Sequence, residues 1–139
     1  RGYLFTGHGG DGKTTIAGLF SAHPDALAVN DDKVIVRKDD DGFRMYGTPW
    51  HGDGGWASPR SAPLEKVFIL KQSPRDSGRS LSPVEAVGRM LSRAFVPPWD
   101  QEKINFTLEF LENLHQQIPC QELGFVPEPS IADFVLNLD

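Results

Sequence analysis

Eight consecutive residues near the start of the chain have the types and spacing of a phosphate-binding loop. The segment Gly7-His8-Gly9-Gly10-Asp11-Gly12-Lys13-Thr14 fits the pattern of Gly, four residues, Gly, Lys and Ser or Thr without a mismatch. Glycine permits positive φ, so backbone N–H groups can approach phosphate oxygens closely. A lysine at this position supplies positive charge to the β- and γ-phosphates, and the threonine hydroxyl ligates Mg²⁺. The pattern predicts binding of ATP and Mg²⁺.

The strand and the helix expected on either side of this loop agree with the interpretation as a phosphate-binding loop. Gly2–Thr6 has the composition of a buried strand, and Lys13 to about Ser21 is compatible with a short helix whose positive end faces the phosphates. The alternative is an ordinary glycine-rich turn between a strand and a helix. The residues predicted to bind nucleotide are Gly7, His8, Gly9, Gly10, Asp11, Gly12, Lys13, Thr14 and Thr15.

Two carboxylates, Asp31 and Asp32, follow Lys13 within twenty residues. They come just after the apolar run Ala26–Val29, which we expect to be a buried strand that delivers polar groups at its carboxyl end. One Asp is expected to hold Mg²⁺ together with Thr14, and the other to accept the proton of an attacking hydroxyl. The sequence does not say which Asp has which role. The alternative is an Asp pair that simply begins a turn.

A long segment, Gly47–Pro63, contains seven Gly and Pro residues and is expected to form a loop. It also carries Trp50, His51 and Trp56, which are costly to leave in water, so we expect the loop to lie near the phosphate-binding loop and to close over it. His51 is a candidate for orienting an acceptor hydroxyl, although lone loop histidines are more often surface groups. The tryptophans either wall a pocket or hold the loop down by packing.

Three further residues are weaker candidates. Arg60 and Lys71 are positioned in the sequence to neutralise a transferred phosphate, or they are exposed structural charges. Cys120 has no partner cysteine and no activating motif, so packing is its expected role.

The remaining pattern predicts an α/β fold with a mixed sheet in a single domain over residues 1–139. Lys38–Gly42 reads as a hairpin turn, and Ser82-Pro83-Val84-Glu85 as a helix start with a capping box. Because the first expected strand feeds directly into the glycine-rich loop, we expect the chain to be a fragment that lacks an upstream part. Strands are expected at 26–29, 34–37, 43–46, 67–70 and 122–126, a polar connection at 72–79, and helices at 83–95, from Asp100 to before Pro119, and after a second capping box at Ser130–Asp133.

The composition of the chain disfavours two classes of partner, nucleic acids and membranes. Fourteen Lys and Arg against nineteen Asp and Glu give a net charge of −5, which disfavours a nucleic-acid partner. There is no run of 18 apolar residues and no signal peptide, so no membrane partner is expected. A single cysteine among 139 residues favours the reducing cytoplasm. The composition does not decide whether the chain forms a homo-oligomer.

The motif Gly7–Thr15, followed after a short helix by an apolar run and Asp31-Asp32, resembles the HPr kinase/phosphorylase catalytic domain and the related ATP-dependent phosphoenolpyruvate carboxykinases. The segments Tyr46–Gly52, Leu81–Ala86 and Pro119–Phe125 are similar to a largely uncharacterised bacterial branch of HPr-kinase-like proteins. The resemblance implies a phosphate-loop nucleotide-binding fold and an ATP- and Mg²⁺-dependent kinase that phosphorylates a hydroxyl. It does not imply HPr as the substrate, because no counterpart of the distal arginine-containing signature is found.

Three functions follow from these observations. The first is a phosphotransferase in which Lys13 binds phosphate, one Asp holds the metal and the other accepts the proton of an unidentified protein or small-molecule acceptor. The second is a regulatory or scaffold module that binds ATP without transferring phosphate. The third is a carboxykinase-like enzyme, which the short chain and the absence of a recognisable manganese or oxaloacetate site disfavour.

Overall fold

The computed structural model describes residues 1–138 as an α/β fold built on one mixed sheet. The six strands are β1 (Gly2–Thr6), β2 (Val34–Asp39), β3 (Gly42–Gly47), β4 (Ser61–Gln72), β5 (Ser77–Ser80) and β6 (Cys120–Phe125). The four helices are α1 (Lys13–Ser21), α2 (Pro83–Leu91), α3 (Gln101–Gln117) and α4 (Ser130–Leu136).

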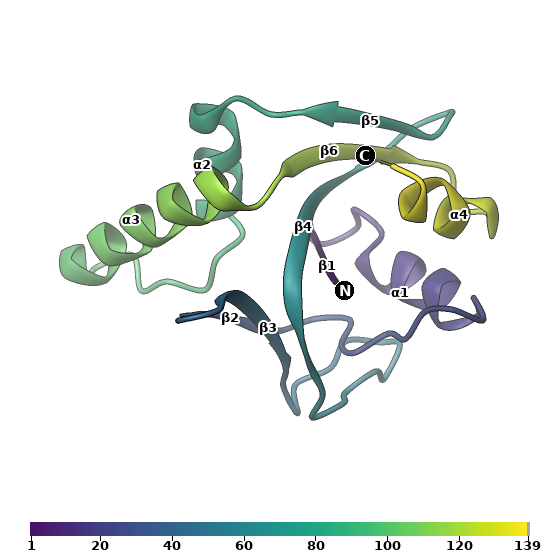
Figure 1. The fold of residues 1–139 in the computed structure, drawn as a ribbon, viewed down its shortest axis with the longest axis horizontal. Coiled ribbons are helices and arrows are strands. Elements are labelled where there is room, and N and C mark those ends of the chain that lie inside the picture. The colour runs from purple at the N-terminus through teal and green to yellow at the C-terminus, as the bar shows by residue number, and fades with distance from the viewer. Residues whose placement is uncertain (139) are drawn as a thin grey trace.

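Strand β4 is the centre of the sheet. It runs parallel to β1 and β6 and antiparallel to β3, and the order β2-β3-β4-β6-β5 describes the main path of the sheet. Figure 1 shows α2 and α3 on one side of β4 and α1 and α4 on the other. Each pair of helices covers a separate apolar cluster, so the central sheet lies between two helical layers.

Successive side chains of β4 point to opposite faces of the sheet, so this strand contributes to both apolar clusters. Val67 and Ile69 belong to the cluster under α2 and α3, whereas Phe68 and Leu70 belong to the cluster under α1 and α4. All four are at most 2% exposed, as expected of a parallel strand covered on both faces. Phe5 of β1 stacks on Phe68 with a ring-centroid distance of 5.3 Å, and this contact fixes the strand that leads into the glycine-rich loop.

Most expected elements are present. The strand at Gly2–Thr6, the helix at Lys13–Ser21, the β2–β3 hairpin and the helix capped by Asp100 are confirmed. In α2, the Ser82 hydroxyl accepts the Glu85 N–H while the Glu85 carboxylate accepts the Ser82 N–H, so the expected capping box is also confirmed.

The expected strand at Ala26–Val29 is wrong. This segment has no strand neighbour, and its nearest ladder interaction is an isolated bridge between Asn30 and Ala57. The Val29 carbonyl accepts the Ser58 N–H, so the backbone of the segment bonds to the long loop. Leu27 is 56% exposed, so the run is not fully buried.

Several expected boundaries also differ. Helix α2 ends at Leu91 and not at Phe95, and Phe95, which is 96% exposed, has no core to join. Strand β4 begins at Ser61, inside the expected loop, and accommodates Pro63 near its start. Strand β6 covers 120–125, so it begins two residues earlier and ends one residue earlier than the expected strand.

Two predictions about polar segments fail as well. Strand β5 lies within and just beyond the expected polar connection, where all four of its residues are exposed and give no alternating apolar pattern. The capping box at Ser130 is wrong, because Pro129 is the N-cap of α4 and no side chain caps that helix.

Candidate functional site

The loop between β1 and α1 is built from the expected motif. Gly10 and Gly12 have φ of 86° and 103°, values that favour glycine. Gly12 also lies against Phe125, since a Cβ at Gly12 would meet the ring of Phe125 at 2.6 Å. Gln72, at the end of β4, donates its side-chain N–H to the Gly10 carbonyl at 2.8 Å. The loop is thus fixed from two neighbouring strands.

Lys13 folds back over this loop. Its ammonium donates to the Gly7 carbonyl at 3.0 Å and to the His8 carbonyl at 3.1 Å. Asp11 closes the loop from the other side, because its carboxylate accepts the His8 N–H at 2.6 Å. In the described part of the chain, the N–H groups of Gly9 and Gly10 have no acceptor. Backbone donors and one ammonium are therefore gathered in a single turn.

Asp31 is brought to the start of α1. Its Oδ2 lies 3.3 Å from the Thr14 hydroxyl, which donates to it, although the two residues are 17 positions apart. The same carboxylate accepts the N–H groups of Gly52 and Gly54, each at 2.8 Å. Asp31 is only 5% exposed, and it is one of two buried polar residues in the described chain.

Asp32 has different surroundings. It is exposed, and its carboxylate pairs with the adjacent Lys33 at 2.8 Å. Asn30 shapes the turn that separates the two carboxylates, since its side-chain oxygen accepts the N–H groups of Asp32 and Lys33. The structure therefore joins Asp31, but not Asp32, to Thr14 by a hydrogen bond.

The long loop lies beside this site, as expected. Its amides at Gly52 and Gly54 bind Asp31, and Trp56 lies against Gly18 of α1 and donates its indole N–H to Ser21 at 3.3 Å. Trp50 remains 62% exposed. Packing holds Trp56 in place, and closure of the loop over a ligand stays a prediction.

Other expected site residues are less closely involved. His8, Thr15 and His51 are exposed, and the His51 ring bonds only to the neighbouring Gly52 carbonyl among the described residues. Arg60 is exposed and lies beside the cavity described below. The sequence analysis missed Asn30 and Gln72, and the only available signal was that Asn often closes a turn through its side chain.

A cavity of about 1320 Å³ opens next to these groups. Lys13, Asp31 and Asp32 line it, together with strand β1 and the segment after α2. Its lining extends beyond the site to both apolar clusters, with Ile16 on one face of the sheet and Leu111 on the other, so only part of this volume adjoins Lys13 and Asp31.

The donor set suits a hard cation such as Mg²⁺. Thr14 and Asp31 offer a hydroxyl and a carboxylate within hydrogen-bond distance of each other. Mg²⁺ prefers oxygen ligands and commonly takes the rest from phosphate and water. Among residues 1–138, no group of three His, Cys, Asp or Glu side chains converges, so a cation cage made of protein side chains alone is not found there.

A basic cluster lies on the α2 side of the sheet. Glu122 of β6 accepts from Arg89 at 2.7 Å and from Arg79 at 3.4 Å, and lies 3.9 Å from Lys71. Burial opposes ionisation of Glu122, but hydrogen bonds from the two arginines outweigh it and lower its pKa. Lys71, a candidate from the sequence, therefore already has an ion-pair partner.

Residues 1–138 include no helix with the length and apolar character needed to cross a bilayer. Comparisons with family models, with curated proteins and with solved structures found no match to this chain. The structure itself shows the fold class, which is α/β with a mixed sheet.

Proposed function

We propose that this chain is an ATP- and Mg²⁺-dependent phosphotransferase of the phosphate-loop, HPr-kinase-like type. The observation that carries the proposal is the hydrogen bond between Thr14 and the buried Asp31, beside Lys13 in a glycine-rich loop. Thr14 follows the loop lysine directly, which is where phosphate-loop proteins place a metal-binding hydroxyl. A buried carboxylate at that hydroxyl is the second group such a metal requires.

Each residue then has one role. Lys13 leaves the carbonyls of Gly7 and His8 and binds the β- and γ-phosphates, while the free loop amides bind phosphate oxygens. Thr14 and Asp31 would hold Mg²⁺, and its charge would neutralise that of the phosphates. Asp32, which lines the same cavity and does not bond to Thr14, accepts the proton of the acceptor.

In the reaction, the acceptor hydroxyl oxygen forms a bond to the γ-phosphorus. The bond between that phosphorus and the β–γ bridging oxygen breaks, and ADP leaves with the bonding electrons. The hydroxyl proton passes to the carboxylate of Asp32.

Transfer of labelled γ-phosphate from ATP to protein and small-molecule fractions of a cell extract tests this function. The unaltered chain is expected to label an acceptor in the presence of Mg²⁺, and Asp32→Asn is expected to label it about 10² to 10⁴ times more slowly while still binding ATP. Binding of Mg²⁺-ATP without labelling of any fraction would contradict the transferase and favour the non-catalytic ATP-binding module.

A further inference from the structure

Arg93 is a half-buried arginine with unusual surroundings, two residues beyond the end of α2. Its Nη1 donates to the Arg89 carbonyl at 2.8 Å and to the Ser92 hydroxyl at 3.2 Å. Its Nε is buried and has no hydrogen-bond partner. No carboxylate among residues 1–138 lies within ion-pair distance of it, whereas Arg79 and Arg89 both have carboxylate partners.

The electrostatic surroundings of Arg93 connect it to the glycine-rich loop. Burial lowers the pKa of the guanidinium, the positive charge of Arg89 lowers it further, and the carboxylate of Asp11 acts in the opposite direction. Asp11 belongs to the loop, so the segment after α2 places Arg93 within electrostatic range of the loop. Arg93 also lines the cavity that Lys13 and Asp31 line.

The loop needs an additional cation if it is to bind several phosphates. The charge of Asp11 offsets that of Lys13, and the Asp11 carboxylate already occupies the His8 N–H. The neighbouring Arg79, Arg89 and Lys71 are engaged by Glu122. A partly buried charge without a partner is costly, and a ligand anion would compensate it.

We propose that Arg93, which lines the same cavity as Lys13, binds the terminal phosphate of the nucleotide. The proposal rests on the proposed function and adds a binding residue contributed by the segment after α2. The planar guanidinium presents several donors to phosphate oxygens. Arg93 thereby balances the negative charge that Asp11 places in the loop.

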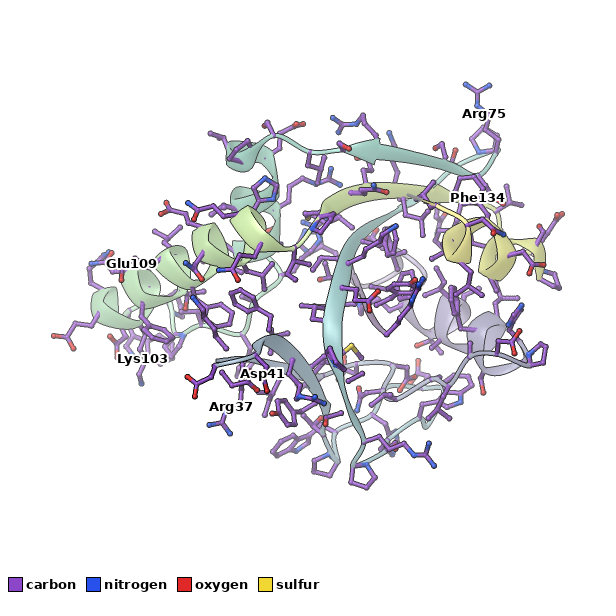
Figure 2. The ribbon with its side chains drawn as sticks, in the orientation of Figure 1. Arg37, Asp41, Arg75, Lys103, Glu109 and Phe134 are labelled. Atoms are coloured by element: carbon purple, nitrogen blue, oxygen red, sulfur yellow. The ribbon has the colours of Figure 1, made fainter. Side chains whose placement is uncertain are left out.

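Calorimetric titration of ATP and ADP, each with Mg²⁺, tests this role. Arg93→Gln is expected to weaken ATP about 10- to 100-fold and ADP by a smaller factor, so the preference for ATP over ADP falls. Arg93→Lys is expected to recover part of this preference. Arg37→Gln is the matched control, because Arg37 is exposed on β2 and projects outward in Figure 2. The control is expected to match the unaltered chain.

A structural role of Arg93 gives a different result. If the substitution only loosened the end of α2, ATP and ADP would weaken by the same factor and Arg93→Lys would not restore the preference, which overturns the proposal. Equal affinities of Arg93→Gln and the unaltered chain for ATP would also overturn it and leave the proposed function standing. Failure of the unaltered chain itself to bind ATP would instead overturn the proposed function.

The isosteric change Asp11→Asn gives an independent check, because it removes the charge and keeps a side-chain oxygen for the His8 N–H. On its own it is expected to tighten ATP. In the double variant with Arg93→Gln, the two effects are expected to depart from the product of the single changes, since both act on one phosphate. Independent effects would count against a shared site.

Discussion

Asp31 and Asp32 are neighbours in the chain, yet their surroundings give them different chemistry. Asp31 is buried and accepts three hydrogen bonds, from Thr14, Gly52 and Gly54. Asp32 is exposed and pairs with Lys33. The sequence predicted a metal ligand within this pair and could not assign it, because the direction of each side chain depends on the turn that Asn30 closes.

The first prediction concerns Mg²⁺. Asp31→Asn is expected to abolish most of the gain in nucleotide affinity that Mg²⁺ provides, because the amide lacks the charge that a hard cation requires. Titration of ATP with Mg²⁺ and with EDTA measures this gain. Asp32→Asn is the matched control and is expected to keep it. Loss in Asp32→Asn with retention in Asp31→Asn would reverse the assignment.

A second prediction at this scale concerns Cys120. Burial raises the pKa of its thiol to about 11, while the unfolded chain ionises near 9.0. Between these values the unfolded state has lost the proton that the folded state keeps, so the free energy of unfolding falls as pH rises. The slope contributed by this thiol is up to about 1.4 kcal/mol per pH unit. Below pH 9 its contribution is constant.

Urea unfolding between pH 8 and 11 measures this slope. Other groups also titrate in that range, so Cys120→Ala serves as the reference. The variant is expected to be less stable at pH 8 because it leaves a cavity, and to show a shallower fall above pH 9, so that the two curves converge. Parallel pH curves for the two proteins would contradict the account.

At the scale of elements, the capping box of Ser82 and Glu85 fixes where α2 begins. Ser82→Ala removes the hydroxyl that accepts the Glu85 N–H, and is expected to lower the free energy of unfolding by about 1 kcal/mol. Urea denaturation provides the value. Val84→Ala, at a position 85% exposed in the same turn, is expected to change it by less than about 0.5 kcal/mol. Equal losses in both variants would argue against the cap.

The loop over residues 48–60 gives the next prediction. Mg²⁺-ATP is expected to slow hydrogen exchange at Gly52 and Gly54, because a metal on Asp31 fixes the carboxylate that their amides bind. Trp50 is expected to lose exposure, while Trp56, already packed on α1, is expected to stay unchanged. Fluorescence of Trp50→Phe and Trp56→Phe separates the two signals.

If neither exchange nor Trp50 emission responds to Mg²⁺-ATP while binding is established, the loop is a fixed wall of the cavity. The structure is already consistent with a fixed position for Trp56. The Trp50 carbonyl also accepts the Asn30 side-chain N–H at 3.0 Å, so the response expected at Trp50 is that of its exposed side chain.

Elements with a strong local signal were predictable. The hairpin followed from Asp41-Gly42 between alternating strands, and α2 from its capping box. Strand β5 gave no such signal, because its stability comes from pairing with β6 and not from its own side chains. The apolar run Ala26–Val29 gave a misleading signal, since strand formation also requires a neighbour to pair with.

At the scale of the whole molecule, the site depends on contacts that are distant in sequence. The loop after β1 receives Gln72 from β4, Phe125 from β6 and the electrostatic influence of Arg93 from beyond α2. The sequence predicted the loop itself through its motif. It did not predict these supporting residues, because sheet order and helix placement decide which of them meet.

Charge distribution also belongs to this scale. The chain carries a net charge of −5, yet the cations Lys13 and Arg93 both line the cavity beside the glycine-rich loop. Local potential, and not net charge, governs attraction of an anionic ligand to a cavity. The negative total is therefore compatible with binding of ATP.

Calorimetric titration with Mg²⁺-ATP tests the central claim most directly. The unaltered chain is expected to bind, and Lys13→Ala to bind about 10- to 100-fold more weakly, with unchanged circular dichroism. Lys103→Ala is the matched control, because Lys103 is exposed on α3, at the far end of the molecule in Figure 2, and its affinity for ATP is expected to be unaltered. Equal affinity of Lys13→Ala and the unaltered chain, or no binding by either, would contradict the account.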